Sequence, residues 1–370
     1  MPEPRVLGQR ALGRALLERQ LLLRRADLAP LRAIEHLGGL QSQAPNAPYV
    51  GLWTRLAGFR PAGLAALMTE RAVVRGHLMR NTVHLVTAAD FLAERGLYQA
   101  AMARNFASSG FARNLAGVDL AAVREAGRAL LAERPRTRAE LGRLLGARWP
   151  GRDPSSLAYA VTYLEPTVQV PPRGIWGVGG PAAFTTAEAW LGGRPAPDPS
   201  PGRLLLRYLA AYGPATVRDA QAWCGLTRLG EVAERLRPRL RTFRDAGGAE
   251  LLDLPGAPRP DPGTPAPPRF LPEYDNVLLA YADRSRVIPG RRRVPLPPGP
   301  GGSGGTVLVD GLWQATWRII RRGEDATLVV EPFTRLPAAQ AAEVTAEGAR
   351  LLAFAVPGTG GRDVQVAAPT

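Results

Sequence analysis

Cysteine, histidine and lysine are all scarce in this sequence. Its 370 residues include one Cys and three His, and all 47 of its basic residues are Arg. A single Cys excludes an internal disulfide and a Cys-based metal cluster, and so few His argue against a zinc site. We therefore expect no metal and a reducing, cytoplasmic environment.

Several motifs that carry common chemistries are also missing. The chain has no GxxxxGK[ST], HExxH or GxSxG sequence, and no GxGxxG that follows a predicted strand. These absences disfavour nucleotide hydrolysis, zinc hydrolysis and dinucleotide redox chemistry, so we expect no cofactor. Charged residues interrupt the apolar stretch Ala11–Leu23, which therefore resembles neither a signal peptide nor a membrane span.

Positive charge is what the sequence has in excess. The formal net charge is +15. Such an excess favours a polyanionic partner, because contacts with phosphates release condensed counterions and the Arg fork matches phosphate oxygens. The alternative is a soluble protein that is merely basic. We attribute the lack of Lys to genomic base composition.

The pattern of elements predicts an α+β protein built from repeated units. Residues 118–199 contain helices opened by polar caps and then a β segment, which is the order of a winged helix. Residues 200–254 repeat this order. Residues 8–95 are mostly helical and also end in a predicted strand. The C-terminal part is mainly β, with a closing helix over 336–354. We predict winged helices at 1–117, 118–199 and 200–254, a linker at 255–268, and a β-barrel with a terminal helix at 269–370.

Local signals predict individual boundaries. Asp27 would cap a helix with Pro30 in its first turn, and Thr137 and Thr216 would open helices through capping boxes. Asp310-Gly311 is a two-residue hairpin turn signal. Strands are expected at 82–86, 167–170, 174–178, 251–254, 277–280, 306–309, 314–320 and 327–330, and a mobile loop at Val294–Gly305.

The candidate catalytic group is Gln41-Ser42-Gln43, which we place at the end of a helix and before a Pro-broken loop. A Gln amide both donates and accepts hydrogen bonds, so two of them could hold a water molecule, although neither is a strong base. Such a site suits a leaving group that is already activated, such as a cationic alkylated purine. The alternative is two ordinary surface residues.

Two basic segments are candidates for contact with nucleic acid. Arg75–His84 carries basic and hydrogen-bonding side chains along a predicted strand and its approach. Between Tyr281 and Arg322 there are eight Arg and only two Asp. The alternatives are a solvated basic turn with one structural His, and a loop that charge keeps soluble.

The chain resembles the winged-helix DNA glycosylase family of AlkZ and YcaQ. The resemblance is carried by the following segments: Leu37–Pro45, Pro48-Tyr49, Gly51–Trp53, Met79–Val86, Gln169–Gly177, Tyr212–Ala215, Trp223, Leu271–Asn276, Asp283–Arg286 and Val309–Gly311. It implies three tandem winged helices and a β-barrel, arranged as a C around a basic DNA channel.

The resemblance also implies roles for particular residues. The catalytic Gln-x-Gln motif falls on Gln41 and Gln43, as in the AlkZ-like branch, whereas YcaQ-like relatives have Asp at the second position. Ser42 occupies a position that the family usually keeps apolar. Candidate DNA-binding residues are Arg75, His77, Arg80, Asn81, Thr82, His84, Arg173, Trp176, Arg284 and Arg286.

The function implied is that of a monofunctional DNA glycosylase for bulky alkylated purines such as N7-alkylguanine, extending to interstrand crosslinks. The AlkZ-like branch is associated with self-resistance to DNA-alkylating antibiotics. The expected partner is duplex DNA that contains such lesions, bound by a monomer in the nucleoid, without a membrane. The alternatives are a non-catalytic regulator with the same domains, which would prefer one duplex sequence, and a structural chromatin protein, which would not need the Gln pair.

Overall fold

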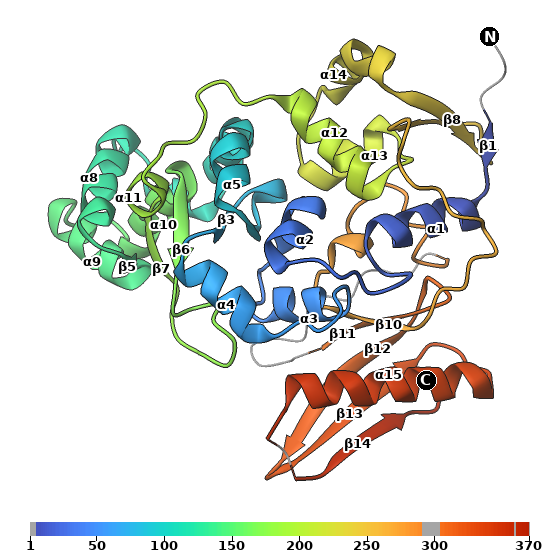
Figure 1. The fold of residues 1–370 in the computed structure, drawn as a ribbon. Helices are drawn as coiled ribbons and strands as arrows, with labels where there is room; N and C mark the ends of the chain where they lie inside the picture. The colour runs from blue at the N-terminus through green and yellow to red at the C-terminus, as the bar shows by residue number, and fades with distance from the viewer. Residues whose placement is uncertain (1–4, 291–303, 359, 370) are drawn as a thin grey trace.

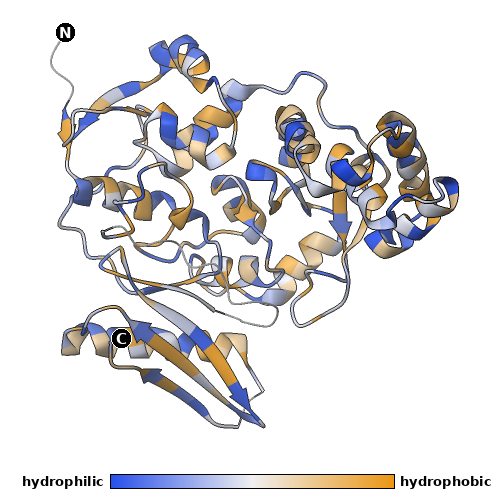
Figure 2. Ribbon diagram, turned by 180° about the vertical axis from the view of Figure 1, so that it is seen from behind, coloured by the Kyte–Doolittle hydropathy of each residue, from blue (hydrophilic) through white to orange (hydrophobic). Residues whose placement is uncertain are grey.

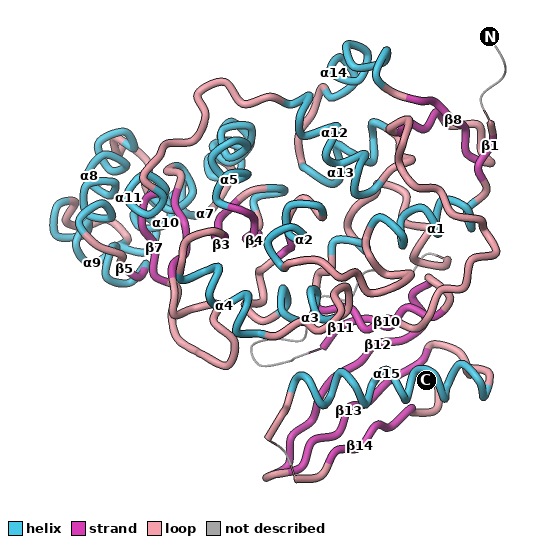
Figure 3. Tube along the Cα trace, viewed as in Figure 1, coloured by secondary structure: helices cyan, strands magenta, loops and turns pink. Residues whose placement is uncertain are grey.

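The structure is a computed structural model that describes residues 5–290, 304–358 and 360–369. Across these residues the chain forms helices and three β-sheets of three, five and six strands, which confirms a mixed α+β architecture (Figures 1 and 3). None of the helices in these ranges is long and apolar enough to cross a membrane.

The six-stranded sheet runs through the first and second predicted units. Its strand order is β2-β4-β3-β6-β7-β5. The two units join where β3 pairs antiparallel with β6, which places Arg75 opposite Gln169 and Gly76 opposite Val168. The strands are β2 (Leu40–Gln41), β3 (Val73–His77), β4 (Val83–Thr87), β5 (Arg136–Thr137), β6 (Thr167–Val170) and β7 (Ala183–Thr186).

Several helices of the N-terminal segment, α2 to α5, pack against the β2-β4-β3 half of this sheet. The second of them, α2, begins at Pro30 after an N-cap at Ala29, so the predicted cap at Asp27 is wrong: the fixed backbone of Pro sets the first turn instead. The helices are α1 (Gln9–Arg19), α2 (Pro30–His36), α3 (Ala47–Trp53), α4 (Pro61–Thr69), α5 (Ala88–Glu94), α6 (Gln99–Ala107) and α7 (Gly110–Asn114).

The middle segment contains three longer helices followed by the β6–β7 hairpin. They are α8 (Leu120–Glu133), α9 (Arg138–Arg148) and α10 (Pro154–Leu164), and the capping box of Thr137 with Glu140 is confirmed. The strand predicted at 174–178 is wrong. Gly174 and Gly177 both have positive φ, so the chain turns there, and the partner of β6 is β7, which is followed by α11 (Ala187–Leu191).

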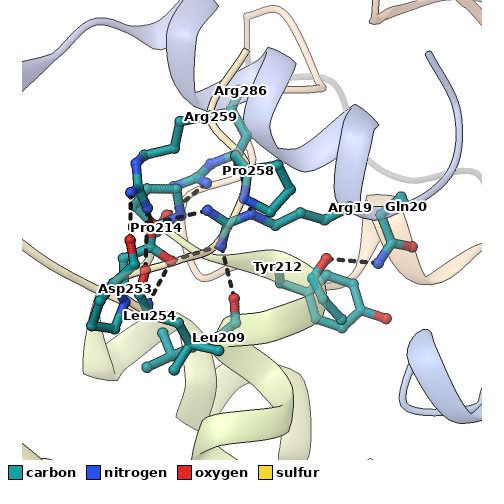
Figure 4. A network of polar contacts seen from close by, with 12 residues as sticks. Arg19, Gln20, Leu209, Tyr212, Pro214, Asp253, Leu254, Pro258, Arg259 and Arg286 are labelled. Carbon is teal, nitrogen blue, oxygen red and sulfur yellow. Dashed lines mark hydrogen bonds and ion pairs between the residues drawn. The ribbon is translucent and has the colours of Figure 1, made fainter. Parts of the chain in front are cut away.

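The third segment is tied to the N-terminus of the chain. Strand β1 (Val6–Leu7) pairs parallel with β8 (Arg241–Asp245), which pairs with β9 (Glu250–Asp253). Helices α12 (Pro201–Tyr212), α13 (Val217–Cys224) and α14 (Leu229–Leu236) precede this sheet, and the predicted capping box of Thr216 is confirmed. Arg19 of α1 donates to both carboxylate oxygens of the buried Asp253, at 2.7 and 2.9 Å (Figure 4).

The C-terminal sheet is open in the described residues, not a closed barrel. Its order is β10-β11-β12-β13-β14, with α15 (Ala338–Ala355) along it (Figure 1). Burial alternates along β13, where every second residue from Ala326 to Pro332 is buried. Figure 2 shows both hydrophobic and hydrophilic stretches along the strands of this sheet. The strands are β10 (Arg269–Pro272), β11 (Gly304–Val309), β12 (Leu312–Arg322), β13 (Asp325–Pro332) and β14 (Arg362–Val366).

Local predictions for this part had mixed outcomes. Asp310 and Gly311 both have positive φ and join β11 to β12, as the turn signal predicted. The predicted strand at 277–280 is wrong: Asn276–Leu278 is a 3₁₀ turn opened by Asp275, whose carboxylate accepts from the Val277 N–H. Apart from residues 304 and 305, which start β11, the predicted mobile loop lies outside the described residues, as do Arg291–Arg293.

One hydrophobic core connects segments that are far apart in the sequence. It includes Leu16 of α1, Val168 of β6, Leu205 of α12 and Trp313 of β12. The predicted unit boundaries stay predictions, but this packing shows that the N-terminal, third and C-terminal segments share apolar surface. The candidate site lies where these segments meet.

Candidate functional site

The Gln41-Ser42-Gln43 segment starts on a short edge strand and not, as predicted, at the end of a helix. Gln41 pairs with His84 of β4, and the Ser42 N–H donates to the Val83 carbonyl at 2.7 Å. Two glycines with positive φ, Gly38 and Gly39, turn the chain from α2 into this strand. A Cβ on Gly39 would lie 2.5 Å from Val86 Cγ1, so the close approach to β4 requires Gly there.

The two Gln side chains of the motif differ in exposure. Gln41 is only 8% exposed, and its Oε1 accepts a hydrogen bond from Arg80 NH2 at 3.2 Å. Gln43 is exposed, and its Oε1 accepts from the Val83 N–H at 3.3 Å. The motif therefore presents one buried, oriented amide and one amide at the surface.

Arg80 connects Gln41 to the third segment of the chain. It has a left-handed backbone with φ of 53°, and its NH1 donates to the carbonyl of Trp223 at the end of α13. A Cβ on Gly225 would lie 3.2 Å from the Arg80 backbone, so the two segments approach closely. Burial lowers the pKa of Arg80.

Asn276 connects the same motif to the C-terminal part. Its Oδ1 accepts from the Gln41 N–H at 3.3 Å, and its side-chain nitrogen donates to the Gly39 carbonyl at 2.7 Å. Asn276 is 3% exposed. It was not among the predicted site residues, although it ends one of the segments that carry the family resemblance.

Three predicted DNA-binding residues of the β3–β4 hairpin are buried. Arg75 donates through Nε to Ser42 Oγ at 2.9 Å and through NH2 to the Ser42 carbonyl at 2.8 Å. His84 Nδ1 lies 3.0 Å from the Thr82 carbonyl, and the His77 ring lies 5.3 Å from that of Tyr163. Burial lowers the pKa of both His to about 3, so both are neutral at neutral pH.

The remaining predicted residues of this hairpin, and those of the second segment, are half-buried. The Thr82 hydroxyl donates to the Met79 carbonyl at 3.1 Å, and Asn81 has a left-handed backbone. Arg173 donates to the Gly180 carbonyl. The Trp176 ring lies 5.0 Å from that of Tyr49, and the Tyr49 hydroxyl accepts from the Trp176 N–H.

The two arginines predicted in the C-terminal segment differ in position. Arg284 is exposed to solvent. Arg286 is 7% exposed, lies over the Tyr281 ring at 3.9 Å, and donates to the Pro214 carbonyl at 3.0 Å (Figure 4). We therefore retain Arg284 as a candidate phosphate contact and assign Arg286 to the interior, because its guanidinium already has internal partners.

Comparison with known proteins identifies the class. Residues 34–354 match the family model described as DNA glycosylase AlkZ-like. The match defines the protein as a DNA glycosylase, an enzyme that removes a base from DNA. Within that class, the chain belongs to the AlkZ-like DNA glycosylase family.

Solved structures show the same fold. Streptomyces sahachiroi DNA glycosylase AlkZ matches with a TM-score of 0.74 and 19% sequence identity, and the match covers 98% of this chain and 100% of that one. At this identity the likeness concerns the fold. A search of curated proteins found no match.

Proposed function

We propose that this DNA glycosylase is monofunctional and hydrolyses the N-glycosidic bond of bulky alkylated purines in duplex DNA. The observation that carries the proposal is the Gln41–Gln43 pair, in which one amide is oriented by Arg80 and the other is exposed. The substrates are N7-alkylguanines, including those in interstrand crosslinks. The biological role is self-resistance to a DNA-alkylating natural product.

Because the two amides differ in exposure, we assign them different roles. Arg donates but cannot accept, so the Gln41 atom that faces Arg80 is the oxygen. The Gln41 amide nitrogen is left to donate, and the exposed Gln43 supplies an acceptor for the attacking water. Two amides cannot strongly activate water, but a cationic N7-alkylpurine leaves without a strong base or acid.

The chain supports hydrolysis without a lyase step. A glycosylase with lyase activity forms a Schiff base through an amine, and no Lys is present to supply a side-chain amine. We further propose that the N-terminal, middle and third segments act as winged helices that hold duplex DNA in a basic channel, with Arg284 among the phosphate contacts. The protein would act as a monomer at the nucleoid.

The test uses a duplex that carries one N7-alkylguanine and measures alkali-labile strand cleavage in single turnovers. We expect excision by the wild type, and a loss on the order of 10²-fold in Gln43→Ala or Gln41→Ala with DNA affinity nearly intact. Gln43→Asp should retain activity, because a carboxylate also accepts a proton from water.

Two further measurements separate catalysis from its alternatives. A melting curve and a DNA-binding isotherm on each variant distinguish a lost water site from an unfolded first unit. Full excision by a folded Gln41→Ala/Gln43→Ala double variant would end the catalytic assignment. Preference for one undamaged duplex sequence, without excision, would instead support a non-catalytic regulator.

A further inference from the structure

Arg75 is a buried cation that contacts the residue between the two motif glutamines. Its side chain is 2% exposed and comes from β3 in the interior of the six-stranded sheet. Two parallel donors of its guanidinium bind Ser42, one at the hydroxyl and one at the main-chain carbonyl, at 2.9 and 2.8 Å. Both rotation of the Ser42 side chain and movement of its peptide would break a hydrogen bond.

Within the described part of the chain, no carboxylate is paired with this charge. In the ranges that the structure describes, Arg75 forms no ion pair, and burial together with the nearby cation of Arg173 lowers its pKa to about 10. An apolar side chain in this place would avoid the desolvation cost of a charge. Packing alone therefore does not account for an Arg at this position, whereas a fork of donors to Ser42 does.

The loop that follows β6 in the middle segment covers the guanidinium of Arg75. Gly174 has φ of 95°, and a Cβ there would lie 2.9 Å from Arg75 Cδ and 3.2 Å from its NH1. The Gly174 carbonyl accepts from the Tyr49 hydroxyl at 2.9 Å, which holds the loop against α3. Arg75 is thus enclosed by the loop on one side and the motif on the other.

Enclosure also bears on contact with DNA. Among the residues that the structure describes, the buried NH1 atom of Arg75 has no hydrogen-bond partner. The same holds for the buried Oε1 of Gln169, the residue opposite Arg75 in the sheet. The other two nitrogens are occupied by Ser42. A phosphate could reach this guanidinium only if the covering loop or the motif moved.

We propose that Arg75 is a positioning residue for excision and not a phosphate contact: it fixes the Ser42 peptide so that Gln41 and Gln43 project from a rigid backbone. Through Gly174, the middle segment thereby supports the motif of the N-terminal segment. This inference rests on the proposed function, because it assigns Arg75 an effect on the Gln pair.

The experiment compares Arg75→Gln, Arg75→Lys and Ser42→Ala in single-turnover excision and in salt-dependent binding to undamaged duplex. We expect Arg75→Gln to slow excision by about 10²-fold, because a misplaced reacting group costs that much. Its duplex affinity should change by less than about twofold and its salt slope should not change. Arg75→Lys replaces the fork of donors by a single ammonium group, so its excision rate should lie between those of the wild type and Arg75→Gln.

The matched control is Arg136→Gln. Arg136 is a buried Arg on β5, at the far edge of the same sheet, and pairs with Glu133 instead of the motif. This variant should leave the excision rate unchanged. Hydrogen exchange across residues 40–48 gives a readout without chemistry: exchange should rise in Arg75→Gln and stay unchanged in the control.

The outcomes separate this inference from the proposed function. Two results would overturn the positioning role: a folded Arg75→Gln protein that excises at the wild-type rate, or one whose salt slope of duplex binding is lower by about one unit. If Arg75→Gln fails to fold, full excision by both Arg75→Lys and Ser42→Ala would overturn it. Loss of excision in the Gln43 variant, with no change in the Arg75 variants, would leave the proposed function standing alone.

Discussion

His84 lies directly behind the motif, opposite Gln41 across β2 and β4, and is 1% exposed. Its Nδ1 contacts the Thr82 carbonyl at 3.0 Å, so the ring acts there as a neutral donor. The positive charge of Arg80 nearby further disfavours protonation of His84. The residue therefore supports the site through its shape and one hydrogen bond, and not by transferring a proton.

The burial of His84 predicts a pH dependence of stability. The pKa is about 3 when folded and about 6.5 when unfolded, so between these values only the unfolded chain binds the proton. Stability should therefore fall as the pH drops from 6.5 towards 3. His84→Asn keeps a donor for Thr82 but removes this titration, so its urea midpoint should fall less steeply on acidification. Parallel pH profiles for the two proteins would contradict the assignment.

At the scale of elements, α8 and α10 approach closely because of a single glycine. A Cβ on Gly127 of α8 would lie 2.2 Å from Cγ2 of Val161, which is fully buried on α10. Gly146 of α9 contrasts with it, because the nearest atom to its Cβ position is Pro154 Cγ at 3.4 Å. Helix propensity favours Ala over Gly at both positions, so packing decides whether each Gly→Ala substitution stabilises or destabilises the protein.

Gly127→Ala should destabilise the protein, because overpacking a core costs about 1–3 kcal/mol and exceeds the gain in helix propensity. Gly146→Ala is the matched variant and should be neutral or stabilising by up to about 1 kcal/mol. Urea unfolding of both variants provides the measurement. A stabilised Gly127→Ala protein would show that α8 and α10 separate at little cost.

Across the whole molecule, the formal charge of +15 overstates how many arginines are available to a polyanion. Arg19, Arg55, Arg75 and Arg95 are among the largest fully buried side chains. Two of them form internal ion pairs, Arg19 with Asp253 and Arg55 with Asp275. We therefore expect contact with DNA phosphates to come from exposed arginines, and Arg284 is one of these.

Arg284 and Arg286, which lie near the start of the basic segment 281–322, should respond differently to substitution. Arg284→Ala should lower the salt slope of binding to every duplex by about one unit, as expected for one lost phosphate contact. Arg286→Ala should leave the slope unchanged and lower the melting temperature, because it removes the hydrogen bond to Pro214. Fluorescence anisotropy over a range of NaCl concentrations tests both, and equal slopes for wild type and Arg284→Ala would reject that contact.

Local sequence patterns determined many of the elements. The capping boxes at Thr137 and Thr216 and the turn at Asp310-Gly311 were predicted correctly, because their signals act within four residues. The family could also be inferred, because its motifs are contiguous segments. Predictions failed at Gly174–Val178 and Val277–Ala280, where β-branched residues lie in turns that the surrounding structure imposes.

Only the tertiary structure decided how the candidate site is built. The sequence indicated Gln41 and Gln43 but not that the first is buried and the second exposed, because burial depends on the strand β2 and its pairing with β4. The contact of Asn276 with Gln41 joins residues separated by 235 positions. Basic residues that look alike in sequence also differ in role, because an Arg side chain is long enough to reach either solvent or a buried carbonyl. The partner that each one meets is set by segments distant in the chain.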